Sequence, residues 1–172
     1  MALFSALFPY VHADSVYGMD FEHIYEIGFR GLEFDIDNTL VGHDAPANEQ
    51  AAGLFQKLKK IGFELCIISN NNEARVKPFA DAVGSRYVYK AGKPYTKGYL
   101  EGCRLMGLDK DRVLFFGDQF FTDIWGANRS GIKSVLVKRM YFHERWTIHL
   151  KRILEKVIFV FYRFSGSYNR KL

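Results

Sequence analysis

Short apolar runs alternate with amphipathic stretches along most of this chain. Runs with the length and composition of buried strands occupy residues 31–34, 63–68, 86–89, 113–116 and 133–137. Stretches with apolar residues at helical spacing lie between them, at residues 48–61, 73–83, 96–106 and 121–129. Strands that alternate with helices predict an α/β fold, in which a parallel sheet with right-handed crossovers carries helices on both faces.

The first 30 residues show no clean period, although residues 20–28 could form one helix. Residues 1–13 are apolar, but they lack a basic leading region and are interrupted by Pro9. A secretory signal is therefore not expected, and we interpret this segment as a hydrophobic arm that packs on the domain. No apolar stretch of the chain approaches the roughly 20 residues that a membrane-spanning helix needs.

The length of 172 residues suits a single domain. We expect this domain to consist of an arm (1–30), a catalytic core (31–137) and a tail (138–172). The two cysteines, Cys66 and Cys103, are far apart and stand in no metal-ligand spacing. This predicts reduced structural thiols and a cytoplasmic protein.

The excess of positive over negative charge is confined to the tail. Residues 138–172 hold nine Lys and Arg against two Asp and Glu, whereas residues 1–137 hold 15 against 17. Apolar residues recur at helical spacing from Leu150 to Phe161, with basic residues on the other faces. Such a helix can lie on an anionic membrane, or its apolar stripe can cover a flank of the sheet. Nucleic acid is not an expected partner, because the tail contains no known binding module.

Polar side chains follow four of the predicted strands, at the point where each strand ends. They are Asp35 and Asp37 after the first strand, Ser69 after the second, Lys93 beyond the third, and Asp118 and Asp123 after the fourth. Ligands of parallel α/β sheets bind outside the carboxyl ends of the strands. We therefore expect all of these groups to gather at one edge of the sheet.

Four carboxylates with one lysine and one serine describe a site for a phosphate and a hard cation. Neighbouring carboxylates resist ionising together unless a cation or a shared proton relieves them, and oxygen-only ligands favour Mg²⁺. A carboxylate could then attack a phosphate monoester. The lysine would neutralise both anions, and the serine would donate a hydrogen bond to a phosphoryl oxygen.

Each of these residues also has a purely structural interpretation. Aspartates that follow strands are ordinary turn residues, and Lys93 could be a solvated loop charge. Ser69 could cap a helix, and Asp123 could favour the first turn of one. The catalytic interpretation is favoured because groups suited to one phosphate and metal site follow four successive strands.

The motifs resemble those of the haloacid dehalogenase-like (HAD) phosphohydrolases. The pattern of that family is Asp-x-Asp-x-Thr, then a Ser or Thr at a strand end, then a Lys, then two Asp separated by three or four residues. In this sequence the motifs stand in that order as Asp35-Ile-Asp37-Asn-Thr39, Ser69, Lys93, and Asp118 with Asp123. The resemblance implies a Rossmann-like three-layer fold and a Mg²⁺-dependent phosphatase that forms an aspartyl-phosphate.

Carried over by position, the resemblance makes Asp35 the nucleophile. Asp37 would protonate the leaving oxygen and later activate water, while Ser69 and Lys93 would complete the catalytic set. The implied metal ligands are Asp35, Asp37 through its backbone carbonyl, Asp118, and Asp123 as a ligand or a supporting residue. The implied phosphate-binding residues are Thr39, Ser69, Asn70 and Lys93.

Three phrases are similar to those of the capless YqeG-type subgroup (subclass IIIA) and of phosphatidylglycerophosphate phosphatases: Ser-Asn-Asn-Asn-Glu-x-Arg-Val, Gly-Lys-Pro and Gly-Asp-Gln-x-x-Thr-Asp. Only residues 41–48 separate the first motif from its helix, so we expect no cap domain and an open site that accepts a bulky phosphate. The resemblance implies phosphatidylglycerophosphate as a candidate substrate and a place on the inner membrane face. The alternatives are a phosphatase for a small soluble metabolite and a non-catalytic membrane or protein adaptor.

Overall fold

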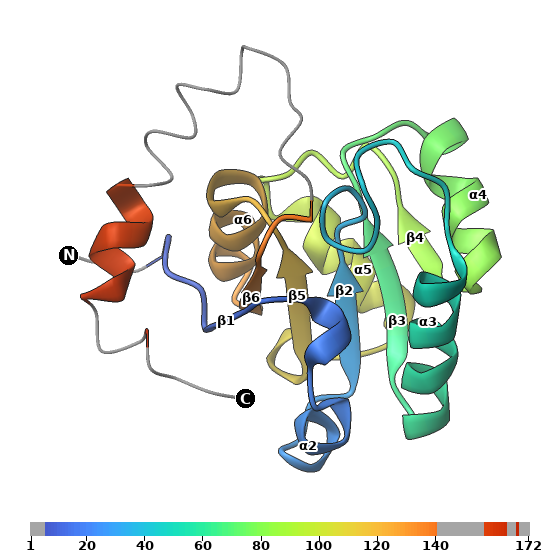
Figure 1. Cartoon of the computed structure of the whole chain (residues 1–172), viewed down its shortest axis with the longest axis horizontal. Coiled ribbons are helices and arrows are strands. Elements are labelled where there is room, and N and C mark those ends of the chain that lie inside the picture. The colour runs from blue at the N-terminus through green and yellow to red at the C-terminus, as the bar shows by residue number, and fades with distance from the viewer. Residues whose placement is uncertain (1–5, 141–156, 165–167, 169–172) are drawn as a thin grey trace.

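The computed structural model, which describes residues 6–140, 157–164 and 168, contains a six-stranded parallel sheet (Figure 1). The strands are β1 (Val11–Ala13), β2 (Gly31–Phe34), β3 (Glu64–Ile68), β4 (Arg86–Val88), β5 (Val113–Gly117) and β6 (Lys133–Val137). Their order across the sheet is β1-β6-β5-β2-β3-β4. The predicted α/β fold with a parallel sheet is therefore confirmed.

Helices cover both faces of the sheet, as expected from the apolar strands. One face packs against α2 (Phe21–Glu26), α3 (Glu49–Ile61) and α4 (Glu73–Val83), and the other against α5 (Lys97–Met106) and α6 (Trp125–Arg129). The ends of α3 show why the sequence predicted it closely. The Asn48 side chain accepts a hydrogen bond from the Ala51 amide, and Gly62 ends the helix in the left-handed conformation. Cys66 and Cys103 are buried and free.

The N-terminal arm contributes a strand that the sequence did not reveal. β1 pairs in parallel with β6, with Val11 opposite Val135, and the Tyr10 amide donates a further hydrogen bond to the Ser134 carbonyl at 2.8 Å. A three-residue edge strand is too short to show an alternating pattern. The arm does pack on the domain, but it does so by extending the sheet.

The element after β5 also differs from the helix expected at 121–129. The chain forms a π-helical turn, η3 (Phe120–Ile124), before α6 begins at Trp125. In this wider turn the Trp125 amide donates to the carbonyl of Phe120, five residues earlier. Such turns are frequent at functional sites, and this one carries Asp123.

Only part of the predicted tail helix lies within the described residues. Residues 157–163 are helical, with Ile158 and Tyr162 buried, whereas the part of the predicted stripe before Val157 falls outside the described ranges. Among the residues that the structure describes, no helix is both long and apolar enough to cross a membrane.

Candidate active site

Most of the predicted site residues follow three strands that are neighbours in the sheet, whereas Lys93 follows β4. Phe34 of β2 pairs with Ile67 of β3 on one side and with Phe116 of β5 on the other. The carboxyl ends of these strands are therefore level with one another. This register brings Asp35, Ser69 and Asp118 to one edge of the sheet, as the sequence predicted.

A buried group of three carboxylates and one ammonium occupies this edge. The Lys93 Nζ atom lies 2.6 Å from Asp35 Oδ1 and 2.7 Å from Asp123 Oδ1. Asp35, Asp118 and Asp123 present carboxylate oxygens within 4.8 Å of one another, and all three residues are buried. We call Asp35, Lys93, Asp118 and Asp123 the inner cluster. The predicted convergence of these distant segments is thus present in the structure.

A second cationic side chain, that of Arg139 after β6, contacts this group. The Arg139 Nε atom donates to Asp118 Oδ2 at 2.6 Å. The sequence interpretation gave Arg139 no role, although Arg139 stands two residues beyond the end of β6. The strand-end rule that located Asp35 and Asp118 would have found it, had the last strand been included.

Burial dominates the electrostatics of the inner cluster. It raises the pKa of Asp35 to about 7, an effect that Lys93 opposes and the neighbouring Asp123 charge strengthens. Burial also raises the pKa of Asp118 well above its usual range, with Asp123 adding to the rise and Arg139 opposing it. For Lys93, burial disfavours the ammonium, but the charges of Asp123 and Asp35 prevail and raise its pKa, so Lys93 stays protonated.

The donor set fits a hard divalent cation. Asp118 Oδ1 is buried and has no hydrogen-bond partner among the described residues, which is a costly state for a carboxylate oxygen. Both oxygens of Asp123 are already occupied, Oδ1 by Lys93 and Oδ2 by the Gln119 amide at 3.0 Å. Asp35 and Asp118 therefore fit as metal ligands, whereas Asp123 fits as the residue that holds Lys93. The expected contribution of the Asp37 carbonyl stays a prediction.

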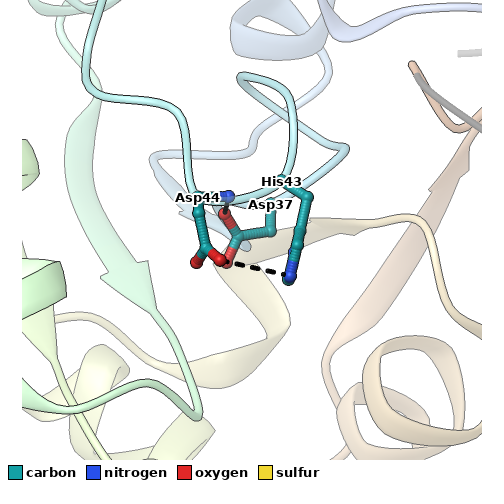
Figure 2. A group of neighbouring side chains, drawn as sticks. All are labelled: Asp37, His43 and Asp44. Carbon is teal, nitrogen blue, oxygen red and sulfur yellow. Dashed lines mark hydrogen bonds and ion pairs between the residues drawn. The ribbon is translucent and has the colours of Figure 1, made fainter. Parts of the chain in front are cut away.

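Both carboxylate oxygens of Asp37 take part in a second group of polar contacts. Its Oδ2 atom accepts a hydrogen bond from Asn71 Nδ2 at 2.7 Å, and its Oδ1 atom accepts from the Arg75 guanidinium and the Asp44 amide, both at 3.0 Å. Figure 2 shows Asp37 beside His43 and Asp44 in the loop that follows β2. We call Asp37, Asn71 and Arg75 the outer cluster.

The sequence interpretation assigned no role to Asn71 or Arg75. Arg75 lies in the first turn of α4 and donates a second hydrogen bond to the Ala45 carbonyl at 2.8 Å, so it ties this helix to the loop after β2. Both residues fall within the phrase Ser-Asn-Asn-Asn-Glu-x-Arg-Val. That phrase was a usable signal, but nothing in it indicated Asp37 as the partner.

The remaining predicted phosphate-binding residues lie on segments that follow β2 and β3. Ser69 is buried, and its Oγ atom accepts a hydrogen bond from the Asn71 amide at 3.2 Å. The Thr39 hydroxyl is buried with no partner among the described residues. The Asn70 side chain accepts from the Lys93 amide at 2.7 Å and donates to the Lys93 carbonyl at 3.0 Å. Asn70 therefore fixes the loop that presents Lys93, and its contact with a substrate stays a prediction.

The fold and the site define a parallel α/β protein with an acidic, lysine-containing centre at the strand ends. A model of the family described as "haloacid dehalogenase-like hydrolase" matches residues 42–131, and the chain belongs to this family of hydrolases. It is similar to a probable phosphatase, YqeG, of Bacillus subtilis, with 36% identity over 138 residues that cover 80% of each protein. The resemblance stated from the motifs is thus confirmed.

Two further comparisons place the chain more broadly. It is 25% identical over 146 residues to phosphatidylglycerophosphate phosphatase 1 of Arabidopsis thaliana, where the match covers 76% of this chain but only 40% of the relative. A crystal structure of an uncharacterized protein from Listeria monocytogenes has the same fold, with a TM-score of 0.55 and 19% identity over 68% of this chain and 84% of that one.

Proposed function

We propose that this protein is a Mg²⁺-dependent phosphomonoester hydrolase that acts through an aspartyl-phosphate on Asp35. The observation that carries the proposal is the Lys93 ammonium, which lies between Asp35 and Asp123 beside the unpartnered Asp118 oxygen. A buried carboxylate paired with a fixed cation suits nucleophilic attack on an anionic phosphate. The similarity to a probable phosphatase supports the same assignment.

In the first step an Asp35 oxygen attacks phosphorus, and the bond from phosphorus to the ester oxygen breaks. A Mg²⁺ ion held by Asp35 and Asp118 would supply positive charge that offsets the repulsion between the nucleophile and the phosphate. Lys93 holds Asp35 in place and neutralises part of the charge on the transferring group. Thr39 and Ser69 offer hydroxyl groups to the phosphoryl oxygens.

Asp37 would transfer the protons in both steps. As an acid it donates a proton to the departing ester oxygen, and as a base it takes one from the water that attacks the phosphorus of the aspartyl-phosphate. The second step releases inorganic phosphate and restores the Asp35 carboxylate. Asn71 and Arg75 hold the Asp37 carboxylate at the mouth of the site, so they would govern how it turns toward the substrate.

The substrate is proposed to be a phosphate on a bulky group, with phosphatidylglycerophosphate as the first candidate. In the described part of the chain, only the loop from Asp35 to Asn48 separates β2 from α3, which leaves no room for a cap domain there. The similarity to the Arabidopsis relative supports a phospholipid substrate. A small soluble phosphate ester is the alternative that the substrate panel below distinguishes.

The test is hydrolysis of an aryl phosphate by the purified protein, with and without Mg²⁺, for the wild type and the Asp35→Asn variant. We expect activity only with Mg²⁺ and a loss of at least about 10³-fold in the variant, because the amide is a poor nucleophile. Asp111→Asn is the matched control, since Asp111 is exposed and lies just before β5, at the end of the strand opposite the inner cluster.

Activity that survives Asp35→Asn would contradict the nucleophile assignment. A wild type inactive on every phosphate ester tested would favour the adaptor alternative. A panel containing phosphatidylglycerophosphate, lysophospholipid phosphates and small sugar phosphates then ranks the substrates by kcat/KM, and a preference for the small esters would overturn the lipid proposal alone.

A further inference from the structure

The helical segment 157–163 carries apolar side chains on all sides. Residues 157–164 read Val-Ile-Phe-Val-Phe-Tyr-Arg-Phe, so Arg163 is the sole charged residue among them. A helix that is apolar all round is normally buried all round. The structure buries only one side of this one.

The inner side of the helix packs on the loop that follows β5. Ile158 shares a buried apolar cluster with Phe120, Ile124 and Leu136, and the Phe159 ring lies 6.2 Å from the Phe120 ring, centroid to centroid. Phe120 and Ile124 bound the π-helical turn η3, which carries Asp123. The helix is thereby fixed to a loop of the catalytic centre.

The outer side of the helix presents a continuous apolar surface to solvent. Val157 is 47% exposed, Val160 51%, Phe161 58% and Phe164 86%. Their spacing of i, i+3, i+4 and i+7 places them on one stripe, opposite Ile158. We call these four residues the outer stripe. Contiguous apolar surface of this kind marks a contact with a partner or a membrane.

We propose that the outer stripe docks on the surface of an anionic lipid bilayer. The charge of the tail is the argument for this partner, because residues 138–172 hold nine Lys and Arg against two Asp and Glu. In the sequence, basic residues stand on both sides of the stripe, at Lys151, Arg152, Lys156, Arg170 and Lys171, with Arg163 inside it. Apolar insertion combined with basic residues binds anionic headgroups.

A second copy of the chain fits this surface less well. Self-association through the stripe would bring together two tails of the same strong positive charge, and like charges at an interface cost free energy. An anionic bilayer turns the same charge into attraction. The lipid surface is therefore the occupant that both the apolar and the basic features of the tail favour.

The tail also contacts the catalytic loop directly. The Met140 amide donates to the Asn38 carbonyl at 3.3 Å, between Asp37 and Thr39, and Arg139 holds Asp118. The outer stripe belongs to a helix that packs on η3, the turn that carries Asp123. Binding to a membrane does not require catalysis. Only the idea that this binding helps the enzyme to reach a lipid substrate rests on the proposed function.

The experiment is co-sedimentation of the full chain with phosphatidylcholine vesicles, with and without phosphatidylglycerol, in EDTA so that no catalysis occurs. We expect binding to the anionic vesicles that weakens as salt is raised. The double variant Phe161→Ser/Phe164→Ser should bind about tenfold more weakly, because it removes two aromatic side chains from the apolar contact. Arg163→Glu should weaken binding to anionic vesicles as well.

The matched control is Ile27→Ser/Leu100→Ser, which removes two apolar side chains that are 47% and 43% exposed on other elements. It should bind vesicles like the wild type, and cooperative thermal unfolding checks that all variants are folded. No binding by the wild type, or equal binding by the stripe variant, would overturn the proposal. A dimer that the stripe variant abolishes, without vesicle binding, would assign the surface to a second copy. Inactivity on the aryl phosphate would count against the proposed function alone.

Discussion

Asp35 and Asp37 are two residues apart in the sequence, yet their surroundings differ in every respect that matters for chemistry. Asp35 is buried in the inner cluster and shares the Lys93 ammonium with Asp123. Asp37 is half-buried, and a guanidinium, a side-chain amide and a backbone amide all donate to it. One motif thus delivers two carboxylates into two environments.

The difference shows how position on a parallel sheet sets the role of an acid. The residue directly after β2 is enclosed by the neighbouring strand ends, and burial raises its pKa to about 7. Two residues later the chain has turned into the loop shown in Figure 2, where α4 and Asp44 supply the hydrogen-bond donors. The proposed nucleophile and the proposed proton carrier thus differ in environment rather than in residue type.

The largest effect is expected from removing the cation of the inner cluster. Lys93→Met leaves the Asp35 and Asp123 carboxylates buried without their partner, which should cost roughly 3–5 kcal/mol of unfolding free energy and lower kcat by about 10³-fold or more. Urea unfolding of the metal-free protein at pH 8 measures the first, and aryl phosphate hydrolysis the second. Lys77→Met is the control, because Lys77 pairs with Asp81 on the surface and should change stability by less than about 1 kcal/mol.

A Lys93→Met protein as stable as the wild type would show that the inner carboxylates relieve one another by sharing protons. The buried carboxylates of the inner cluster would then be stabilised by shared protons rather than by the charge of Lys93. Unfolding curves at pH 6 and pH 8 separate these cases, since proton sharing weakens as the pH rises.

A smaller effect is expected in the outer cluster. Arg75→Gln removes the guanidinium from Asp37 and from the Ala45 carbonyl, so Asp37 loses its orientation while the inner cluster stays intact. We expect kcat to fall about 10–100-fold with little change in KM, as is typical when a residue that orients a catalytic group is removed. Arg75→Lys should recover part of the rate, because it restores the charge without the planar fork.

The control for this variant is Arg86→Gln, since Arg86 pairs with Glu64 on the surface, away from the site. A shift in the pH–rate profile should accompany the loss in Arg75→Gln, because the charge beside the proton carrier has changed. An unaltered rate and profile would mean that Arg75 only ties α4 to the loop.

The inner cluster was predictable from sequence, whereas much of the outer cluster was not. Asp35, Ser69 and Asp118 each follow an apolar run, and parallel strands end at one edge, so local pattern was enough. One of the donors to Asp37 is Arg75, 38 residues away on a helix. No local pattern encodes that distance, because it depends on how α4 packs against the loop.

The same reasoning explains the errors in the fold. The ends of α3 and α4 carry asparagine caps and glycine stops, and the expected ranges agree with the structure to within a residue. β1 and the π-helical turn η3 have no such local signals. β1 exists because β6 offers it an unpaired edge, and η3 places Asp123 where Lys93 can reach it. Both depend on tertiary contacts that the sequence pattern does not show.

The smallest effect is the pH dependence of stability and of Mg²⁺ binding. It tests whether burial makes Asp35 of the inner cluster harder to ionise. Because the pKa of Asp35 is raised to about 7, its contribution to the stability of the metal-free fold is fully present below its ordinary pKa of roughly 4 and is lost as the pH rises through about 7. The metal-free protein should therefore unfold at a lower temperature at pH 8 than at pH 6, apart from effects of other groups. Mg²⁺ needs the ionised carboxylate, so its apparent affinity should be about tenfold weaker at pH 6 than at pH 8.

Thermal unfolding with and without Mg²⁺ at the two pH values measures this, and the stabilisation by Mg²⁺ should be greater at pH 8. Asp118→Asn removes the unpartnered oxygen's charge and should abolish most of the Mg²⁺ effect, whereas Asp111→Asn, at the opposite end of β5, should leave it unchanged. Equal stabilisation by Mg²⁺ at both pH values would mean that Asp35 is ionised throughout. In that case the two carboxylates of the first motif would differ in their hydrogen-bond and ion-pair partners, and burial would not keep Asp35 protonated at pH 6.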